Sequence, residues 1–264
     1  MSATATRPAS STAAPGLRSA TPARSSDDGA IRLLIVLAFD TAQGALSAAI
    51  HDSEGERAAA FEPRTRGHAE ALMPMIETVL AQAALGFADL DALAVTVGPG
   101  TFTGLRVGLA AARGIALART LPLVGVTTLE AIAEPVVPDE AEAIIASFDA
   151  RRGEIYVQIF AAGLAALTAP LLVALDDIGA HLPETPLILA GTGAPLLAPG
   201  LDARGLRYRL SETRPQPDAS AIARLALARL TARGPDAFRT APQPLYIRPP
   251  DAKLPGGRTP GEAA

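Results

Sequence analysis

The sequence of 264 residues contains no cysteine and no tryptophan, and Lys253 is its only lysine. Without cysteine the chain forms no disulfides, zinc–cysteine centres or iron–sulfur clusters, and it has no thiol nucleophile. A phosphate loop of the Walker type is excluded as well, and Lys253 is the one candidate for Schiff-base chemistry. The net charge of −4 argues against a strong overall attraction to nucleic acid.

Both ends of the chain differ in composition from the middle. Residues 1–30 are mostly Ser, Ala, Thr, Pro and Arg, with Leu17 as almost their only large apolar residue. We expect a disordered extension there, because it buries too little apolar surface to offset the entropy of ordering. It lacks the apolar core of a secretory signal, and its Arg and Ser content leaves an organelle transit peptide as the alternative. Residues 251–264 are expected to form a loose C-terminus.

The longest uncharged stretch covers residues 155–175 and approaches the length of a membrane span. Gln158, Gly163 and Pro170 interrupt it, and its first part is better suited to a strand. We therefore predict a strand, a loop and a second strand in a soluble, cytoplasmic protein.

The folded part opens with two apolar runs, residues 31–39 and 45–51, which predict two strands joined in a hairpin. Asp40 and Thr41 begin the turn between them. Hydroxyl and backbone N–H groups in such a turn are able to face a phosphate. An ordinary hairpin turn is the equal alternative.

A helix is predicted over residues 68–85, because apolar residues recur on one face with helical spacing. The face comprises Leu72, Met75, Ile76, Val79, Leu80 and Ala83. The next apolar run, residues 90–97, predicts a strand that leads into a glycine-rich segment.

The glycine-rich segment covers residues 98–108 and reads Gly-Pro-Gly-Thr-Phe-Thr-Gly-Leu-Arg-Val-Gly. Its place between a strand and a helix would put helix N–H groups on an anion, but it matches neither a Walker loop nor the dinucleotide-binding fingerprint. Thr103 is the expected N-cap of a helix over residues 104–119. Small residues recur four apart on that helix, at Gly104, Gly108, Ala112 and Ala116. This ridge allows close approach either to the chain's own sheet or to another chain.

Several motifs occur here in the order in which one known family carries them. They are Asp40-Thr41, His68 with Leu72-Met73-Pro74, residues 98–108, residues 125–129, residues 149–156 and residues 244–248. On these motifs the chain, over residues 31–256, resembles the TsaB (YeaZ) family, the dimerisation subunits of the bacterial tRNA threonylcarbamoyladenosine machinery. The most specific motif comprises Gly98, Pro99, Gly100, Thr101, Phe102, Thr103, Gly104 and Arg106.

The resemblance implies an α/β protein with the two-lobed actin/Hsp70/sugar-kinase-like (ASKHA) fold, in which mixed sheets are flanked by helices. We expect an N-terminal lobe over residues 31–128 that carries the partner-binding helices. A second lobe is expected over residues 129–212, and a C-terminal helix and tail over residues 213–250. Vestigial nucleotide loops are expected at Asp40, Thr41, Gly191, Thr192 and Gly193.

The resemblance also implies a non-catalytic scaffold that supports the subunit TsaD, which transfers a threonylcarbamoyl group to adenosine 37 of tRNA. A small ATPase, TsaE, joins the assembly. ATP and metal are expected in these partner subunits, with no cofactor in this chain. Contact with tRNA is expected only through the complex, contact with membranes is not expected, and the chain alone is expected to form a homodimer.

The expected partner interface lies on the first two helices. It comprises His68, Leu72, Met73, Met75, Ile76, Val79, Leu80, Gly104, Gly108, Ala111, Ala112 and Ile115. The TsaD branch binds a metal through a His-x-x-x-His pair on its first helix. In this chain His68 stands at the first of these positions and Leu72 at the second, so no metal site is expected.

Two enzymatic alternatives stay open. An ATP-dependent small-molecule kinase of the same fold would use the loops at Asp40-Thr41 and 191–193 for phosphate, although a general base is not evident. A glycoprotease-like peptidase is more remote, because the sequence lacks HExxH, GxSxG and the spacing of a serine triad.

Overall fold

The computed structural model describes Met1 and residues 33–248. The extension expected over residues 1–30, apart from Met1, and the loose end expected over residues 251–264 lie outside the described residues. Within the described part, no helix is both long and apolar enough to cross a membrane.

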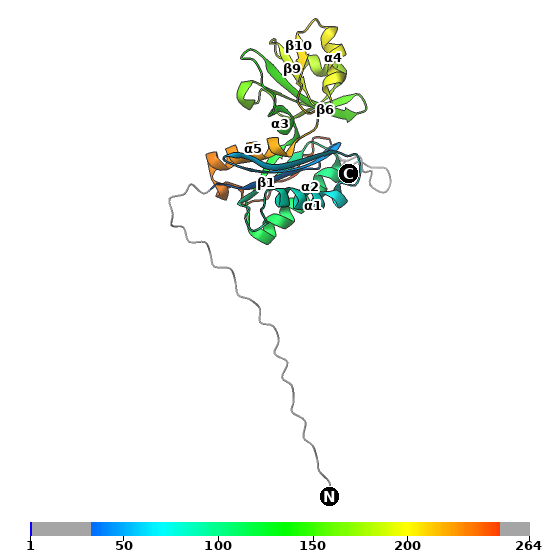
Figure 1. The fold of residues 1–264 in the computed structure, drawn as a ribbon. Coiled ribbons are helices and arrows are strands. Elements are labelled where there is room, and N and C mark those ends of the chain that lie inside the picture. The colour runs from blue at the N-terminus through cyan, green and yellow to red at the C-terminus, as the bar shows by residue number, and fades with distance from the viewer. Residues whose placement is uncertain (2–32, 249–264) are drawn as a thin grey trace, which may run out of the picture. The chain divides into compact units, whose positions relative to one another are not determined.

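Two five-stranded mixed sheets form the framework (Figure 1). The first has the order β3-β2-β1-β4-β5 and the second the order β10-β9-β6-β7-β8. The strands of the first are β1 (Val36–Asp40), β2 (Ala45–Asp52), β3 (Gly55–Pro63), β4 (Ala92–Gly98) and β5 (Leu123–Thr127). Those of the second are β6 (Ala143–Arg151), β7 (Glu154–Phe160), β8 (Leu171–Ala174), β9 (Leu187–Ala190) and β10 (Tyr208–Leu210).

The second sheet repeats the topology of the first. In each, the first three strands form an antiparallel meander, and the last two add in parallel on the other side of the first strand. Thus β6 corresponds to β1 and β9 to β4. Residues 155–175 supply β7, a short 3₁₀ turn and β8, which confirms the predicted strand, loop and strand.

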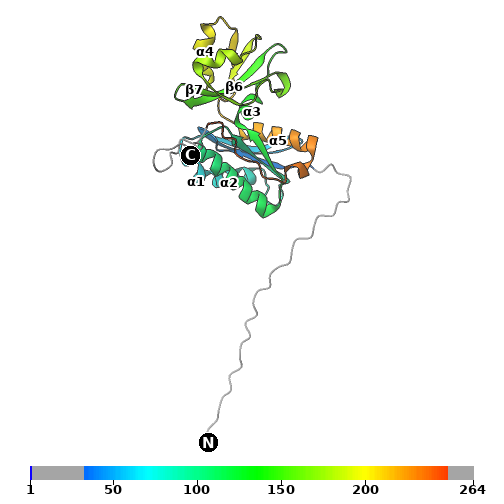
Figure 2. The same ribbon diagram turned by 180° about the vertical axis from the view of Figure 1, so that it is seen from behind.

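In residues 33–248, five α-helices cover the sheets. They are α1 (His68–Gln82), α2 (Phe102–Arg119), α3 (Thr128–Ala133), α4 (Ala194–Asp202) and α5 (Ala219–Arg233). Figure 1 shows α1 and α2 on one face of the first sheet and α5 on its opposite face, and the view from behind agrees (Figure 2). Short 3₁₀ turns complete the pattern at Ala162–Leu164, Leu175–His181 and Pro235–Phe238.

The two lobes exchange helices. Helix α3 follows the first sheet in sequence but packs Leu129 and Ile132 against the second. Helix α5 follows the second sheet but packs Ile222 and Ala226 against the first. The exchanged helices are joined by ion pairs: Arg224 forms a two-pronged pair with Glu134, at 2.6 and 2.5 Å. Each lobe therefore closes its core with a helix that the other lobe delivers.

The start of α2 differs from the expectation. The helix begins at Phe102, and Thr101 rather than Thr103 is its N-cap. Thr101 has the extended backbone that an N-cap requires, and its hydroxyl accepts a hydrogen bond from the Gly104 N–H at 3.2 Å. Thr101 and Thr103 are both suitable N-cap residues by type. The contact of the Thr101 N–H with the Ala42 carbonyl in the β1–β2 turn places Thr101 at the cap position.

Candidate functional site

The turn between β1 and β2 lies directly against the first turn of α2. The Thr101 N–H donates to the Ala42 carbonyl at 2.8 Å. The Thr41 hydroxyl donates to the Gly104 carbonyl at 2.7 Å, in a buried setting. Two hydrogen bonds of opposite direction thus fix the glycine-rich motif to the first hairpin.

The glycines of the motif make this contact sterically feasible. A Cβ atom at Gly104 would overlap the Thr41 carbonyl oxygen, and one at Gly100 would stand 2.7 Å from the Ala42 carbonyl oxygen. At Gly108 a Cβ would stand 2.6 Å from the Thr41 hydroxyl. Real side chains do not make such contacts, so the segment that resembles a phosphate-binding loop receives the chain's own turn.

Asp40 is fully buried next to this turn. Its Oδ1 accepts hydrogen bonds from the Thr96 hydroxyl at 2.5 Å and from the Ala42 N–H at 3.1 Å, whereas its Oδ2 has no hydrogen-bond partner. Burial disfavours the charged form and raises the pKa of the Asp40 carboxyl to about 7.

The second glycine loop, residues 191–193, is bonded internally in a similar way. The Gly193 N–H donates to the Ser147 carbonyl at 3.1 Å, and a Cβ at Gly191 would overlap the same carbonyl oxygen. The N–H groups of Leu196 and Leu197, at the start of α4, both donate to the Gly193 carbonyl. The Thr41 hydroxyl, the Thr101 N–H and the Gly193 N–H are thus bonded to the chain itself.

The predicted interface residues divide into an inner and an outer set. Leu72, Ile76, Val79 and Leu80 are between 0 and 4% exposed and pack against the first sheet. Gly104, Gly108 and Ala112, on the inner face of α2, are also buried. Placing these seven at a partner surface was wrong, because the apolar stripe and the small ridge both face the chain's own sheet. Of the two alternatives for the small ridge, contact within the chain is therefore the one observed.

The remaining predicted interface residues are exposed or half-buried. Met73 is exposed, while His68, Met75, Ala111 and Ile115 are half-buried. Sequence reasoning missed a second small stripe on α2, formed by Ala110, Gly114 and Ala118, all exposed. A Cβ at Gly114 would meet no atom within 4 Å. Their four-residue spacing was a signal, but spacing alone does not tell which stripe faces inward.

An aromatic cluster extends this surface at the start of α2. The Arg106 guanidinium lies 3.6 Å from the centre of the Phe102 ring, which lies 5.7 Å from the Tyr246 ring. The C-terminal segment holds Tyr246 there, since the Leu245 N–H donates to the Val97 carbonyl at 2.7 Å. Phe102 and Tyr246 stay about half exposed. We call Met73, Phe102, Ala110, Gly114, Leu117, Ala118 and Tyr246 the α1–α2 outer surface.

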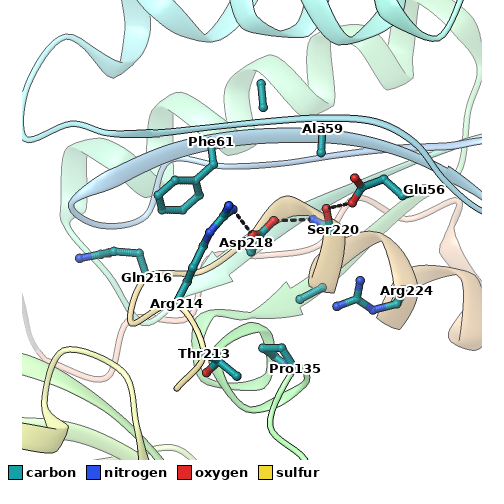
Figure 3. Close-up of a pocket in the computed structure, with 12 residues that line it drawn as sticks. Glu56, Ala59, Phe61, Pro135, Thr213, Arg214, Gln216, Asp218, Ser220 and Arg224 are labelled. Atoms are coloured by element: carbon teal, nitrogen blue, oxygen red, sulfur yellow. Dashed lines mark hydrogen bonds and ion pairs between the residues drawn. The ribbon is translucent and has the colours of Figure 1, made fainter. Parts of the chain in front are cut away.

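A pocket of about 560 Å³ lies on the opposite face of the first sheet, between β3 and the start of α5 (Figure 3). Each of its charged side chains already has a partner within the chain. The Ser220 hydroxyl donates to Glu56 at 2.5 Å, and Arg214 pairs with Asp218 at 2.6 Å. The Arg214 guanidinium also covers the Phe61 ring at 4.5 Å. The lining is thus balanced in charge and internally bonded.

Duplicated mixed sheets, exchanged helices and glycine turns at corresponding places define the two-lobed actin/Hsp70/sugar-kinase class of α/β proteins. A family model described as "TsaD: tRNA N6-adenosine threonylcarbamoyltransferase" matches residues 62–193. The chain belongs to the TsaB (YeaZ) family within that class.

Individual proteins and a solved structure are similar to this chain. The tRNA threonylcarbamoyladenosine biosynthesis protein TsaB of Escherichia coli is 39% identical over 122 residues, which cover 46% of this chain and 52% of the relative. An uncharacterized protein of Mycobacterium tuberculosis is 37% identical over 229 residues, 84% of this chain and 96% of the relative. The solved structure of YeaZ from Pseudomonas aeruginosa has a TM-score of 0.66 and 26% identity, and the match covers 80% of this chain and 99% of that one.

Two glycines of α2 provide a matched test of the turn contact. Gly104→Ala should destabilise the protein by about 2 kcal/mol or more, because the new methyl group displaces the Thr41 carbonyl. Gly114→Ala should stabilise it by about 0.5–1 kcal/mol, since it lowers the backbone entropy cost of the helix in open space. Urea unfolding followed by circular dichroism measures both. Equal effects of the two substitutions would contradict the turn contact.

The raised pKa of Asp40 predicts that the free energy of unfolding depends on pH. The pKa of Asp40 in the folded state, about 7, lies above the ordinary value of 3.8 for an aspartate, so the native state binds more protons between these values. The stabilisation is complete below pH 3.8 and is lost as the pH rises through about 7. Asp40→Asn keeps the neutral form, so its stability relative to wild type should increase by a few kcal/mol across this window.

Urea unfolding of both proteins from pH 5 to pH 8 measures this difference. Burial also lowers the pKa of His51, which acts in the opposite direction, but His51 is present in both proteins and cancels in the comparison. A difference that does not change with pH would show that Asp40 is ionised in the native state throughout.

Proposed function

We propose that the chain is a non-catalytic, cytoplasmic scaffold of the tRNA N6-threonylcarbamoyladenosine modification complex. In this role it binds a TsaD-like catalytic subunit, and a TsaE-like ATPase joins the pair. ATP and metal belong to those subunits, tRNA is contacted only through the complex, and the chain alone forms a homodimer. The similarity to the E. coli tRNA threonylcarbamoyladenosine biosynthesis protein TsaB supports a role in this modification pathway.

The observation that carries the proposal is the α1–α2 outer surface. Leu117, near the C-terminal end of α2, is 84% exposed, and Phe102 at its start and Met73 on α1 are exposed as well. Exposed apolar groups gathered on one face are typical of protein–protein contacts. The stripe of Ala110, Gly114 and Ala118 lets a partner helix approach the backbone of α2 closely. A helical partner therefore fits this surface better than a flat or strongly charged one.

The inner faces of the same helices support a non-catalytic role. Leu72 occupies the position of the second metal-binding histidine in TsaD proteins, and here it is 1% exposed within the hydrophobic core. The Thr41 hydroxyl, which a kinase would need for phosphate, donates to the Gly104 carbonyl instead. Groups that would serve catalysis in a related enzyme thus serve the fold in this chain.

Reconstitution tests the proposed function. The purified chain alone should produce no threonylcarbamoyladenosine in tRNA and should hydrolyse no ATP. Addition of the TsaD-like and TsaE-like subunits from the same cell, with a source of threonylcarbamoyl groups, should give modified tRNA only when this chain is present. Mass spectrometry of tRNA nucleosides provides the measurement. Modification by the chain alone, or by the other subunits without it, would refute the scaffold role.

Single substitutions test the surface that carries the proposal. Leu117→Glu should weaken binding of the TsaD-like subunit at least about tenfold, because a charge replaces an apolar contact. Val137→Glu is the matched control, since Val137 is 83% exposed but lies between α3 and β6. Gly114→Leu should also block docking while the protein stays folded, whereas Gly108→Leu should disturb folding.

Isothermal titration calorimetry gives the affinities, and circular dichroism confirms that each variant is folded. Equal affinities of the Leu117→Glu and Val137→Glu variants would exclude the α1–α2 outer surface as the interface.

A further inference from the structure

A second pocket, of about 420 Å³, lies where the β1–β2 turn meets the starts of α1 and α2. Gln43 lines it from the turn, Arg66, His68 and Glu70 line it from the start of α1, and Thr103 lines it from the start of α2. The proposed partner surface and the internal contact between Thr41 and Gly104 do not account for these side chains.

Nitrogen atoms without partners gather around this pocket. Gln43 is only 9% exposed, yet its Nε2 has no hydrogen-bond partner. The Nε2 of His68, which also lines the pocket, is likewise buried and without a partner among the described residues. Leaving a buried polar group unsatisfied costs about 1–3 kcal/mol. Two such atoms belong to the lining of this pocket, and the Gln43 amide nitrogen can only donate, so it indicates a ligand that supplies a hydrogen-bond acceptor.

Backbone donors converge on the same place. Helix α1 begins after Gly67, whose left-handed conformation (φ 75°) is accompanied by no side-chain cap. At α2, the Thr101 hydroxyl accepts only the Gly104 N–H, and the N–H groups of Phe102 and Thr103 precede the first intrahelical bond. Both helix starts contribute residues to the pocket, and each carries a partial positive charge.

The charged side chains favour an anion on balance. Arg66 is exposed, and no ion pair of its guanidinium occurs among the described residues. Glu70 is the one carboxylate in the lining, and it opposes an anion. This single negative charge is outweighed by the groups that favour an anion. They are the Arg66 guanidinium, two helix starts, the Gln43 amide and the Thr103 hydroxyl.

We propose that this pocket is an oxyanion site that takes a phosphate group, independently of the proposed scaffold role. The donors come from three separate elements, which suits the tetrahedral arrangement of phosphate oxygens better than a planar carboxylate. The volume lies within the range of small-molecule sites, so the phosphate is either the free ion or the end of a small phosphomonoester.

Imidazole NMR of the full chain tests the site, because the protein has only three histidines, His51, His68 and His181. Inorganic phosphate is titrated at constant pH and ionic strength, with chloride as the balancing anion. We expect saturable shifts of the His68 signals and constant signals of the other two. The absence of a His68 shift, or equal shifts of all three histidines, would overturn the proposal.

Substitutions of three exposed residues test the site: Arg66 just before α1, Glu70 in α1 and Arg119 in α2. Arg66→Ala should weaken phosphate binding about tenfold through loss of a charge-assisted hydrogen bond. Glu70→Gln should strengthen it, because repulsion is removed. Arg119→Ala, at the far end of α2, is the matched control and should change nothing. Equal weakening by Arg66→Ala and Arg119→Ala would reduce the effect to general charge and overturn the site.

A parallel titration with glycerol 3-phosphate identifies the source of the phosphate. Equal affinity for both probes assigns the site to the free ion, and tighter binding of the ester assigns it to a small phosphomonoester. Both results support the phosphate site. Weaker binding of phosphate than of chloride or acetate at the same concentration would overturn it.

Discussion

The contact between the β1–β2 turn and the first turn of α2 organises the first lobe. It joins the first hairpin to the start of α2 through two hydrogen bonds and several glycine contacts. Because no side chain larger than hydrogen fits there, the glycine-rich motif follows from packing rather than from phosphate binding. The contact also sets the depth of α2 on the sheet. That depth determines which helix residues reach the core and which stay exposed.

Helix exchange makes the two lobes dependent on each other. The core on one face of the first sheet is closed by α5, and the core of the second sheet is closed in part by α3. The bidentate pair of Arg224 and Glu134 and the pair of Arg229 and Glu130 tie these helices together. A chain cut between the lobes would leave both sheets with an uncovered apolar face. This arrangement suits a scaffold, whose partner surface must stay fixed relative to the rest of the molecule.

The outer and inner faces of α1 and α2 perform separate tasks. Inward, Leu72 and its neighbours pack against the first sheet and stabilise the fold. Outward, Leu117 and the stripe around Gly114 leave an apolar, closely approachable surface. At the shared N-terminal end of the helices, unsatisfied nitrogen atoms indicate a polar ligand instead. The proposed protein partner and the proposed phosphate therefore occupy different parts of the same two helices.

Local pattern in the sequence was sufficient for most strands, for both long helices of the first lobe and for the two-lobed class, because periodicity and glycine turns are properties of neighbouring residues. The TsaB resemblance rested on motifs that are likewise contiguous. The sequence did not determine whether Gly108 or Gly114 faces outward, or whether Thr101 or Thr103 caps α2. Those choices depend on Thr41 and Ala42, which lie about sixty residues earlier in the chain. Only the tertiary structure brings that turn against the helix, and steric exclusion at Gly104 then decides the orientation.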